Sequence, residues 1–225
     1  MVLPPLPSDQ KLSLTERVFG ALRQAILSSQ IKPREYLIIG EIAKQYQISR
    51  TPVREAIIML EREGWVTQDA RRGAKVLAPS LKDILEVIEF QMVLEGYIAR
   101  RAAELLSDED IAEADAILNK SEVALRNGDE DQCRAWGAKF HIFLAQKVGN
   151  KQINATIEQL QDRVDRVRYL IFQQGKAPVE TSAQQHRAVW RAIQERDAAR
   201  AEELMFHHIT WFEKLLTESY NPILD

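Results

Sequence analysis

Two arginines and a threonine lie together on one face of the helix predicted to begin near residue 50. Arg50, Thr51 and Arg54 fall within about one helical turn of each other, and Ser49 occupies the N-cap position. Arginines at this spacing can enter a DNA major groove and read guanine through O6 and N7. The alternative is a solvated charged face that binds nothing. The opposite side of the helix is an apolar stripe of Val53, Ala56, Ile57 and Leu60.

Short elements before this helix form a helix-turn-helix pattern. A helix is predicted over residues 14–28, where Ser13 and Glu16 form a capping box. A break that contains Pro33 separates it from a short helix near residues 41–46. The connection to the arginine-bearing helix is long enough only for a tight corner. Two helices joined in this way, the second with a basic outer face, are typical of DNA-binding proteins.

A β-hairpin is predicted directly after the basic helix. Residues 65–68 and 74–77 are short β-prone runs, and Gly64 before them is a left-handed C-cap candidate. The turn between the runs carries Arg71 and Arg72, whose side chains can reach phosphates or a minor groove. The sequence therefore predicts a winged helix-turn-helix DNA-binding domain over residues 12–78. A mobile, Pro-rich arm is expected before it, at residues 1–11.

The run at residues 49–56, followed by residues 60–66 and 72–73, resembles the GntR family of bacterial transcription regulators. The resemblance implies that the face carrying the two arginines and the threonine contacts base edges or nearby phosphates. It also implies that Gly73 lets the backbone approach the minor groove. Gly40 departs from the pattern, because some relatives have an arginine there that is directed toward DNA. Fewer phosphate contacts would give DNA binding a weaker salt dependence.

Charge is distributed unevenly along the 225 residues. Residues 1–80 contain 12 Lys and Arg against 8 Asp and Glu, whereas residues 81–225 contain 18 against 25. The first part would attract double-stranded DNA and the second would repel it. Cys133 is the single cysteine and suits a reducing cytosol. No apolar run approaches the roughly 18 residues of a membrane span, so we expect a cytoplasmic protein with no membrane contact.

Residues 79–225 are expected to form a second, all-helical domain. Capping residues, glycines and prolines divide this part into six predicted helices, which short loops would join into an antiparallel bundle. We therefore expect a mainly α protein, with a small β-hairpin in the N-terminal winged helix-turn-helix. The six helices are predicted at about residues 80–105, 107–127, 129–148, 151–173, 180–196 and 198–219.

Three of the four histidines are predicted to point into the helical bundle. His186 and His208 share stripes with large apolar residues on their helices, and His141 borders such a stripe. His207 is predicted to face solvent. Three inward histidines from three helices could converge on one point, as in a metal site built in a bundle core. The alternative is three separate buried histidines, each with its own hydrogen bond.

The helical half resembles the effector domain of the FadR subfamily, called the FCD domain. Many members have an Asp four residues before the first His, followed by two more histidines on later helices; here Gly137 replaces that Asp. The resemblance implies a Zn²⁺ or Ni²⁺ ion, or another divalent transition metal, on the three histidines. It also implies an effector site formed by these histidines with Gln91 and Glu95. Relatives often have an arginine at the position of Gln91.

Together these features predict a ligand-responsive transcription regulator and not an enzyme. A homodimer would bind an inverted-repeat operator, and a small-molecule metabolite in the helical domain would modulate DNA binding, with repression as the family's common mode. One alternative keeps the DNA binding but makes the helical domain a dimerisation module without a ligand. Another is a three-His metalloenzyme, against which the sequence offers no obvious general base.

Overall fold

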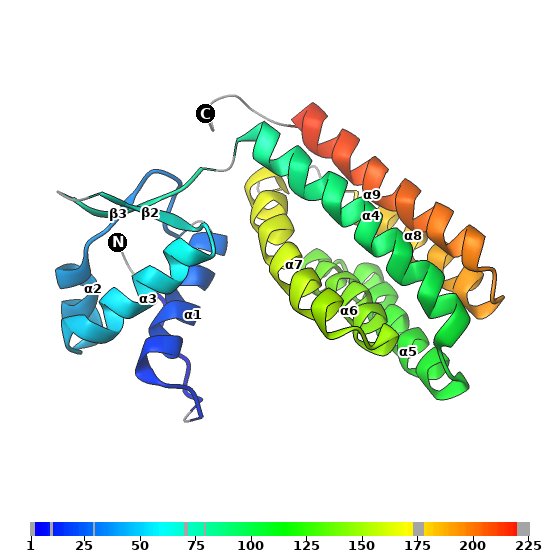
Figure 1. Cartoon of the computed structure of the whole chain (residues 1–225), viewed down its shortest axis with the longest axis horizontal. Coiled ribbons are helices and arrows are strands. Elements are labelled where there is room, and N and C mark those ends of the chain that lie inside the picture. The colour runs from blue at the N-terminus through cyan, green and yellow to red at the C-terminus, as the bar shows by residue number, and fades with distance from the viewer. Residues whose placement is uncertain are drawn as a thin grey trace. The chain divides into compact units, whose positions relative to one another are not determined.

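The computed structural model describes residues 3–9, 11–28, 30–69, 72–78, 80–172 and 178–219, with the backbone alone at residues 158, 162 and 165–172. The chain divides into two compact units, one made mainly of the residues up to Ser80 and the other made mainly of those from Leu81 onward (Figure 1). Each unit has its own buried apolar side chains. The prediction of a mainly α protein with a winged helix-turn-helix and a helical bundle is confirmed.

The first unit is a winged helix-turn-helix. Its helices are α1 (Leu14–Leu27), α2 (Ile39–Tyr46) and α3 (Arg50–Arg62). Its strands β1 (Tyr36–Leu37), β2 (Val66–Asp69) and β3 (Gly73–Val76) form an antiparallel sheet in the order β1-β3-β2. The wing hairpin pairs β2 with β3, as the sequence predicts, while β1 was not predicted.

Local sequence signals account for most boundaries in this unit. Ser13 and Glu16 form the predicted capping box of α1. Gln47 has a φ of 56°, which closes the tight corner between α2 and α3. Gly64 follows Glu63, the C-cap residue of α3, and has a φ of 75°, the left-handed conformation that was expected at this position. Ser49 is the N-cap residue of α3, but its side chain accepts no capping hydrogen bond.

Residues 3–9 make contacts with the first unit that the sequence did not predict. Leu3 is buried and joins the apolar core, and Leu6 packs against the same core. Tyr46 donates a hydrogen bond from its hydroxyl to the Pro4 carbonyl at 2.9 Å. The Arg17 side chain donates to the carbonyl of Pro7 at 2.6 Å. The Pro-rich arm is thereby attached to α1 and α2.

The second unit is built from six helices among the described residues, so the predicted helical bundle is confirmed. Capping boxes and glycines lie where the sequence places them. Ser107 and Asp110 form the box that begins α5, and Gly149 adopts the left-handed conformation that ends α6. The helices are α4 (Leu81–Leu105), α5 (Asp108–Arg126), α6 (Glu130–Val148), α7 (Lys151–Phe172), α8 (Val179–Gln194) and α9 (Ala198–Ser219).

Helix α4 is central to this unit. It packs along α9 and also contacts α6 and α8, which brings residues that are far apart in the sequence to one interior region (Figure 1). Most of its inward positions are apolar, and two polar side chains, Gln91 and Glu95, interrupt this stripe while remaining buried. None of the helices in the described parts of the chain combines the length and apolar character needed to cross a membrane.

Candidate functional site

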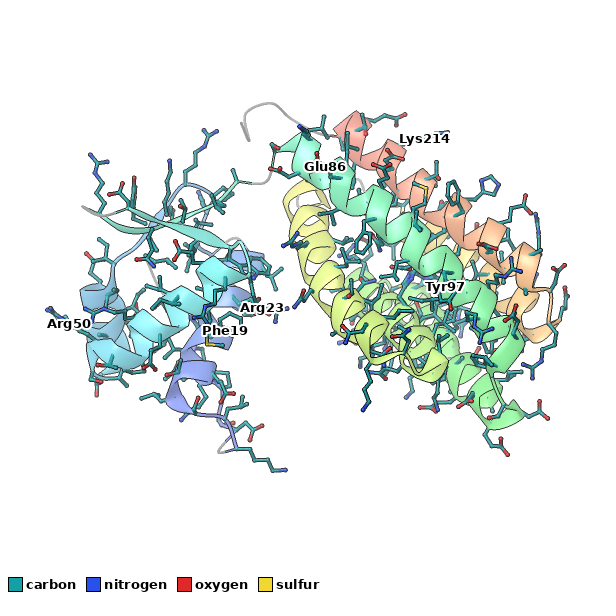
Figure 2. The ribbon with its side chains drawn as sticks, viewed as in Figure 1. Phe19, Arg23, Arg50, Glu86, Tyr97 and Lys214 are labelled. Carbon is teal, nitrogen blue, oxygen red and sulfur yellow. The ribbon has the colours of Figure 1, made fainter. Side chains whose placement is uncertain are left out.

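The outer face of α3 carries the residues predicted to read DNA. Arg50, Thr51 and Arg54 are exposed, whereas the opposite stripe of the helix is buried. Figure 2 shows the Arg50 side chain extending away from the body of the winged helix. Its guanidinium lies 3.8 Å from the position that a Cβ on Gly40 would occupy, so the N-terminal end of α2 lies beside it. Ser49, at the start of the helix, is also exposed.

Side-chain hydrogen bonds hold α3 against its neighbours. Glu55 accepts a hydrogen bond from the Thr15 hydroxyl of α1 at 2.8 Å. Glu61 accepts one from the Gln68 backbone amide at 3.0 Å and another from the Gln68 side chain, which connects α3 to the wing. Two carboxylates on α3 therefore have positioning contacts within the domain. Sequence reasoning assigned them no role, because their partners lie on other elements.

The wing carries one described arginine beside a closely packed glycine. Arg72 is exposed, and its guanidinium carbon lies 5.9 Å from the centre of the Tyr36 ring. A Cβ on Gly73 would lie 2.6 Å from the Leu37 carbonyl oxygen, and Gly73 has a φ of 105°. The close approach of β1 is therefore sufficient reason for glycine at this position. Arg71 lies outside the described residues.

The three inward histidines converge inside the second unit. His141 comes from α6, His186 from α8 and His208 from α9, and each is at most 5% exposed. The Nε2 atom of His186 lies 2.9 Å from that of His141 and 3.1 Å from that of His208. His207 is exposed, as expected. The predicted convergence of three helices on one point is thus confirmed.

Neighbouring side chains orient two of these rings. The Nδ1 atom of His141 lies against Oε2 of Glu95, which comes from α4. The Nδ1 atom of His208 lies 2.8 Å from Oε1 of Gln185. Because carboxylate and amide oxygens accept hydrogen bonds, these two contacts favour the tautomer with the proton on Nδ1 in both rings. In neutral rings of this tautomer, the Nε2 atoms of His141 and His208 each carry a lone pair, and both atoms lie next to Nε2 of His186.

This arrangement of nitrogens fits a metal ion. A neutral His186 carries at most one proton on Nε2, so it cannot donate fully to both neighbouring lone pairs. A cation among the three nitrogens would satisfy all of them, and three imidazoles are a donor set that suits Zn²⁺ and Ni²⁺. Carboxylate and amide oxygens beside Nδ1, as Glu95 and Gln185 provide here, are the kind of outer partner that orients metal-binding histidines.

Glu95 is the polar centre of the surrounding interior. Besides contacting His141, its Oε1 atom accepts hydrogen bonds from the side-chain amides of Gln91 at 2.6 Å and Gln161 at 3.2 Å. A buried carboxylate requires such partners, because burying an unpaired charge is costly. The structure therefore places Gln91 and Glu95 next to the cluster, with Gln91 held by Glu95. Gln161 and Gln185 were not predicted, and no sequence pattern distinguishes them.

Gly137 lies directly against the cluster. A Cβ built at this position would lie 2.9 Å from Cε1 and 3.3 Å from Nδ1 of His186. The ring of Phe140, which is fully buried, lies 5.7 Å from that of His186. The imidazole of His186 therefore occupies the space in front of residue 137, where the family resemblance would place an Asp side chain.

The two sites together define a winged-helix DNA-binding protein joined to a buried histidine cluster, and comparisons with known proteins agree. The model for bacterial regulatory proteins of the gntR family matches residues 14–76, and the FCD domain model matches residues 86–210. The chain belongs to the gntR family of bacterial regulatory proteins and carries an FCD domain. It is an HTH-type transcriptional regulator of a family that is not enzymatic, so the metalloenzyme alternative is not supported.

Similar proteins include repressors. The chain is 29% identical over 196 residues to the HTH-type transcriptional repressor RspR of Escherichia coli K12, covering 87% of this chain and 86% of that protein. It is 25% identical over 197 residues to the repressor GlaR of the same strain, covering 84% and 89%. The solved structure of E. coli McbR/YncC matches the fold with a TM-score of 0.79 at 22% identity, covering 93% of this chain and all of that one.

Proposed function

We propose that this regulator is a ligand-responsive repressor that binds an inverted-repeat operator in the bacterial cytoplasm as a homodimer. The observation that carries the proposal is the exposed basic face of α3, where Arg50, Thr51 and Arg54 lie opposite a fully packed stripe. A helix that is packed on one side and basic on the other is suited to a major groove. Related proteins that are repressors support the sign of regulation.

DNA recognition would combine the recognition helix with the wing. Arg50 and Arg54 would contact guanines or adjacent phosphates, and Thr51 would contact a base edge or a phosphate. Ser49, at the N-terminal end of α3, would contact the phosphate backbone of the DNA. The wing would add Arg71, Arg72 and the Gly73 backbone near the minor groove. Two such domains in a homodimer would occupy successive major grooves of the operator.

The helical domain would sense the effector through its histidine cluster. His141, His186 and His208 would hold a Zn²⁺ or Ni²⁺ ion through Nε2. When bound, such an ion supplies positive charge and coordination positions for an oxygen-bearing small metabolite. Glu95 would keep the His141 ring in its tautomer, and Gln91 would keep the carboxylate in place. The regulator would exist in two conformations, one that binds the operator and one that does not. An effector with different affinities for these two conformations would shift their populations.

The test of DNA recognition starts from a random duplex library enriched with the wild-type protein. Affinity for the enriched sequence is then measured for wild type and for Arg50→Ala/Arg54→Ala. Loss of two base-reading arginines is expected to weaken binding on the order of tenfold or more per residue. The matched control, Arg126→Ala/Arg191→Ala, removes two exposed arginines from the helical domain. Equal affinities of wild type and the α3 double variant would exclude α3 as the recognition helix.

Gly137 favours the second candidate, in which the helical domain only dimerises. The cluster lacks the acidic ligand that many related domains have, and the space in front of residue 137 is taken by His186. Thermal unfolding of the full chain discriminates the two, because a ligand that binds only the folded state stabilises it. A rise in Tm with Zn²⁺ or Ni²⁺ that disappears in His186→Ala/His208→Ala supports the sensor. No rise with either ion supports the dimerisation module.

A further inference from the structure

Large apolar side chains are exposed along one side of α4. Phe90, Val93 and Tyr97 are 51%, 67% and 45% exposed, and they follow each other at helical spacing. On the opposite side of α4, apolar side chains such as Ile84, Ile88 and Ile98 are buried in the bundle. Contiguous exposed apolar side chains of this size are uncommon on monomers and mark interaction sites. These three residues form the centre of what we call the α4 face.

A fourth apolar side chain extends this face onto α9. Phe206 is 46% exposed. Helices α4 and α9 lie side by side and antiparallel, as Arg100 contacts Glu202 at 3.0 Å and the Thr210 hydroxyl contacts the Met92 sulfur at 3.7 Å (Figure 1). These two contacts place Phe206 level with residue 96 of α4. Phe206 therefore lies at the edge of the α4 face, beside its centre of Phe90, Val93 and Tyr97.

Charged residues flank the apolar centre in a pattern that is complementary to itself. Lys82 and Glu86 precede it, and Arg100 and Glu104 follow it; their side chains are 84%, 63%, 50% and 35% exposed. Glu86 and Arg100 are each seven residues from Val93, and Lys82 and Glu104 are each eleven residues from it. If the helix is turned end for end about Val93, each of these four charges falls on a position of opposite sign.

We propose that the α4 face is the surface through which two copies of this chain pair, with the two α4 helices antiparallel across a two-fold axis at Val93. The assignment rests on the homodimer of the proposed function and names its interface. An isologous contact requires a self-complementary surface. Glu86 of each copy meets Arg100 of the other, and Lys82 meets Glu104. A parallel pairing would place like charges opposite each other.

The apolar centre fits the same arrangement. Val93 meets its own equivalent on the axis, with Phe90 and Tyr97 on either side of it along α4. Within one chain Lys82 pairs with Glu86 at 3.8 Å, and Arg100 pairs with Glu104 at 3.7 Å and with Glu202 of α9 at 3.0 Å, all through exposed or half-exposed side chains. Exposed pairs of this kind contribute little and exchange readily for contacts between copies.

Sedimentation of the full chain without DNA tests the axis at Val93. Wild type is expected to be a dimer at micromolar concentration, and Val93→Glu and Val93→Lys are each expected to be monomers, with dissociation constants raised about a hundredfold or more by the two like charges on the axis. An equimolar mixture of the two variants is expected to form a heterodimer. The control Val123→Glu changes an exposed valine of α5 and stays dimeric. Circular dichroism verifies that each variant is folded.

Charge exchange tests the antiparallel direction. Glu86→Arg and Arg100→Glu are each expected to weaken the dimer, and the double variant is expected to restore it. A monomeric wild type, a dimer that persists in Val93→Glu, or a double variant no tighter than either single one overturns the proposal. These outcomes are independent of DNA recognition, because the α3 arginines are intact in every variant. Loss of specific DNA binding in Arg50→Ala/Arg54→Ala together with an unaffected dimer in Val93→Glu would keep the function and reject only the interface.

Discussion

Gly137 and His186 lie so close that no side chain fits between them. The Cβ of any other residue at position 137 would be 2.9 Å from Cε1 of the imidazole, which is nearer than packed carbon atoms come. Because Gly137 is inside α6, its glycine lowers helix stability, and the packing of His186 gives a reason for its presence. The missing Asp and the position of His186 are thus two parts of one arrangement.

The variant Gly137→Ala tests this relationship. We expect it to lower the free energy of unfolding by about 1–3 kcal/mol, because His186 must move within a packed interior. The matched control is Gly20→Ala in α1, where an added Cβ meets no atom within 4 Å. That control is expected to gain about 0.5–1 kcal/mol from helix propensity alone. Urea denaturation measures both, and a stabilised Gly137→Ala would show that the close contact is not real.

Glu95 is expected to strengthen metal binding without touching the metal. Replacing it in Glu95→Gln retains an acceptor for the His141 Nδ1 proton but removes the negative charge. Loss of such an outer partner lowers metal affinity by roughly 10- to 100-fold. Competition between the protein and a chromophoric chelator for Zn²⁺ measures the change. The control is Glu89→Gln, an exposed glutamate on the same helix. Equal Zn²⁺ affinity of Glu95→Gln and wild type would contradict a role for this carboxylate.

The buried hydroxyl of Tyr46 is expected to make the stability of the first unit fall at alkaline pH. Burial raises the pKa of its hydroxyl to about 12, above the ordinary value near 10. The folded state therefore keeps a proton that the unfolded chain loses, so this contribution to stability is complete below pH 10 and is lost as pH rises toward 12. Tyr46→Phe loses the hydrogen bond to Pro4, which costs about 1 kcal/mol at pH 8.

Denaturation of wild type and Tyr46→Phe at a series of pH values checks this account. Phenylalanine does not titrate, so the advantage of wild type over the variant is expected to shrink between pH 10 and 12. A difference between the two proteins that stays constant from pH 8 to pH 12 would mean that the Tyr46 hydroxyl titrates alike in the folded and unfolded chain.

Much of the fold could be predicted because its signals are local. Ser13 with Glu16, Ser107 with Asp110, and Gly149 mark helix ends through contacts within a few residues. Helical periodicity also placed His141, His186 and His208 on inward faces. Periodicity gives the direction of a side chain from its own helix, and three inward directions in a small bundle meet near its centre.

The remaining features depend on contacts between distant segments. Strand β1 has only two residues and forms because β3 pairs with it, so no local sequence pattern predicts it. Gln161 and Gln185 lie on helices with other polar residues, and only the assembled bundle shows that they contact Glu95 and His208. Gln91 and Glu95 were predicted only through the resemblance to the FCD domain, although a carboxylate on the buried side of α4 is itself an unusual feature.

Metal content of the purified protein tests the central claim about the histidine cluster most directly. Untagged protein prepared without chelator is analysed by mass spectrometry beside His186→Ala/His208→Ala, with circular dichroism to verify that the variant is folded. The account predicts about one transition-metal ion per wild-type chain and none in the variant, because His141 alone cannot retain it. Wild-type protein without metal, or a variant that retains as much as wild type, would contradict the claim that His141, His186 and His208 form a metal centre.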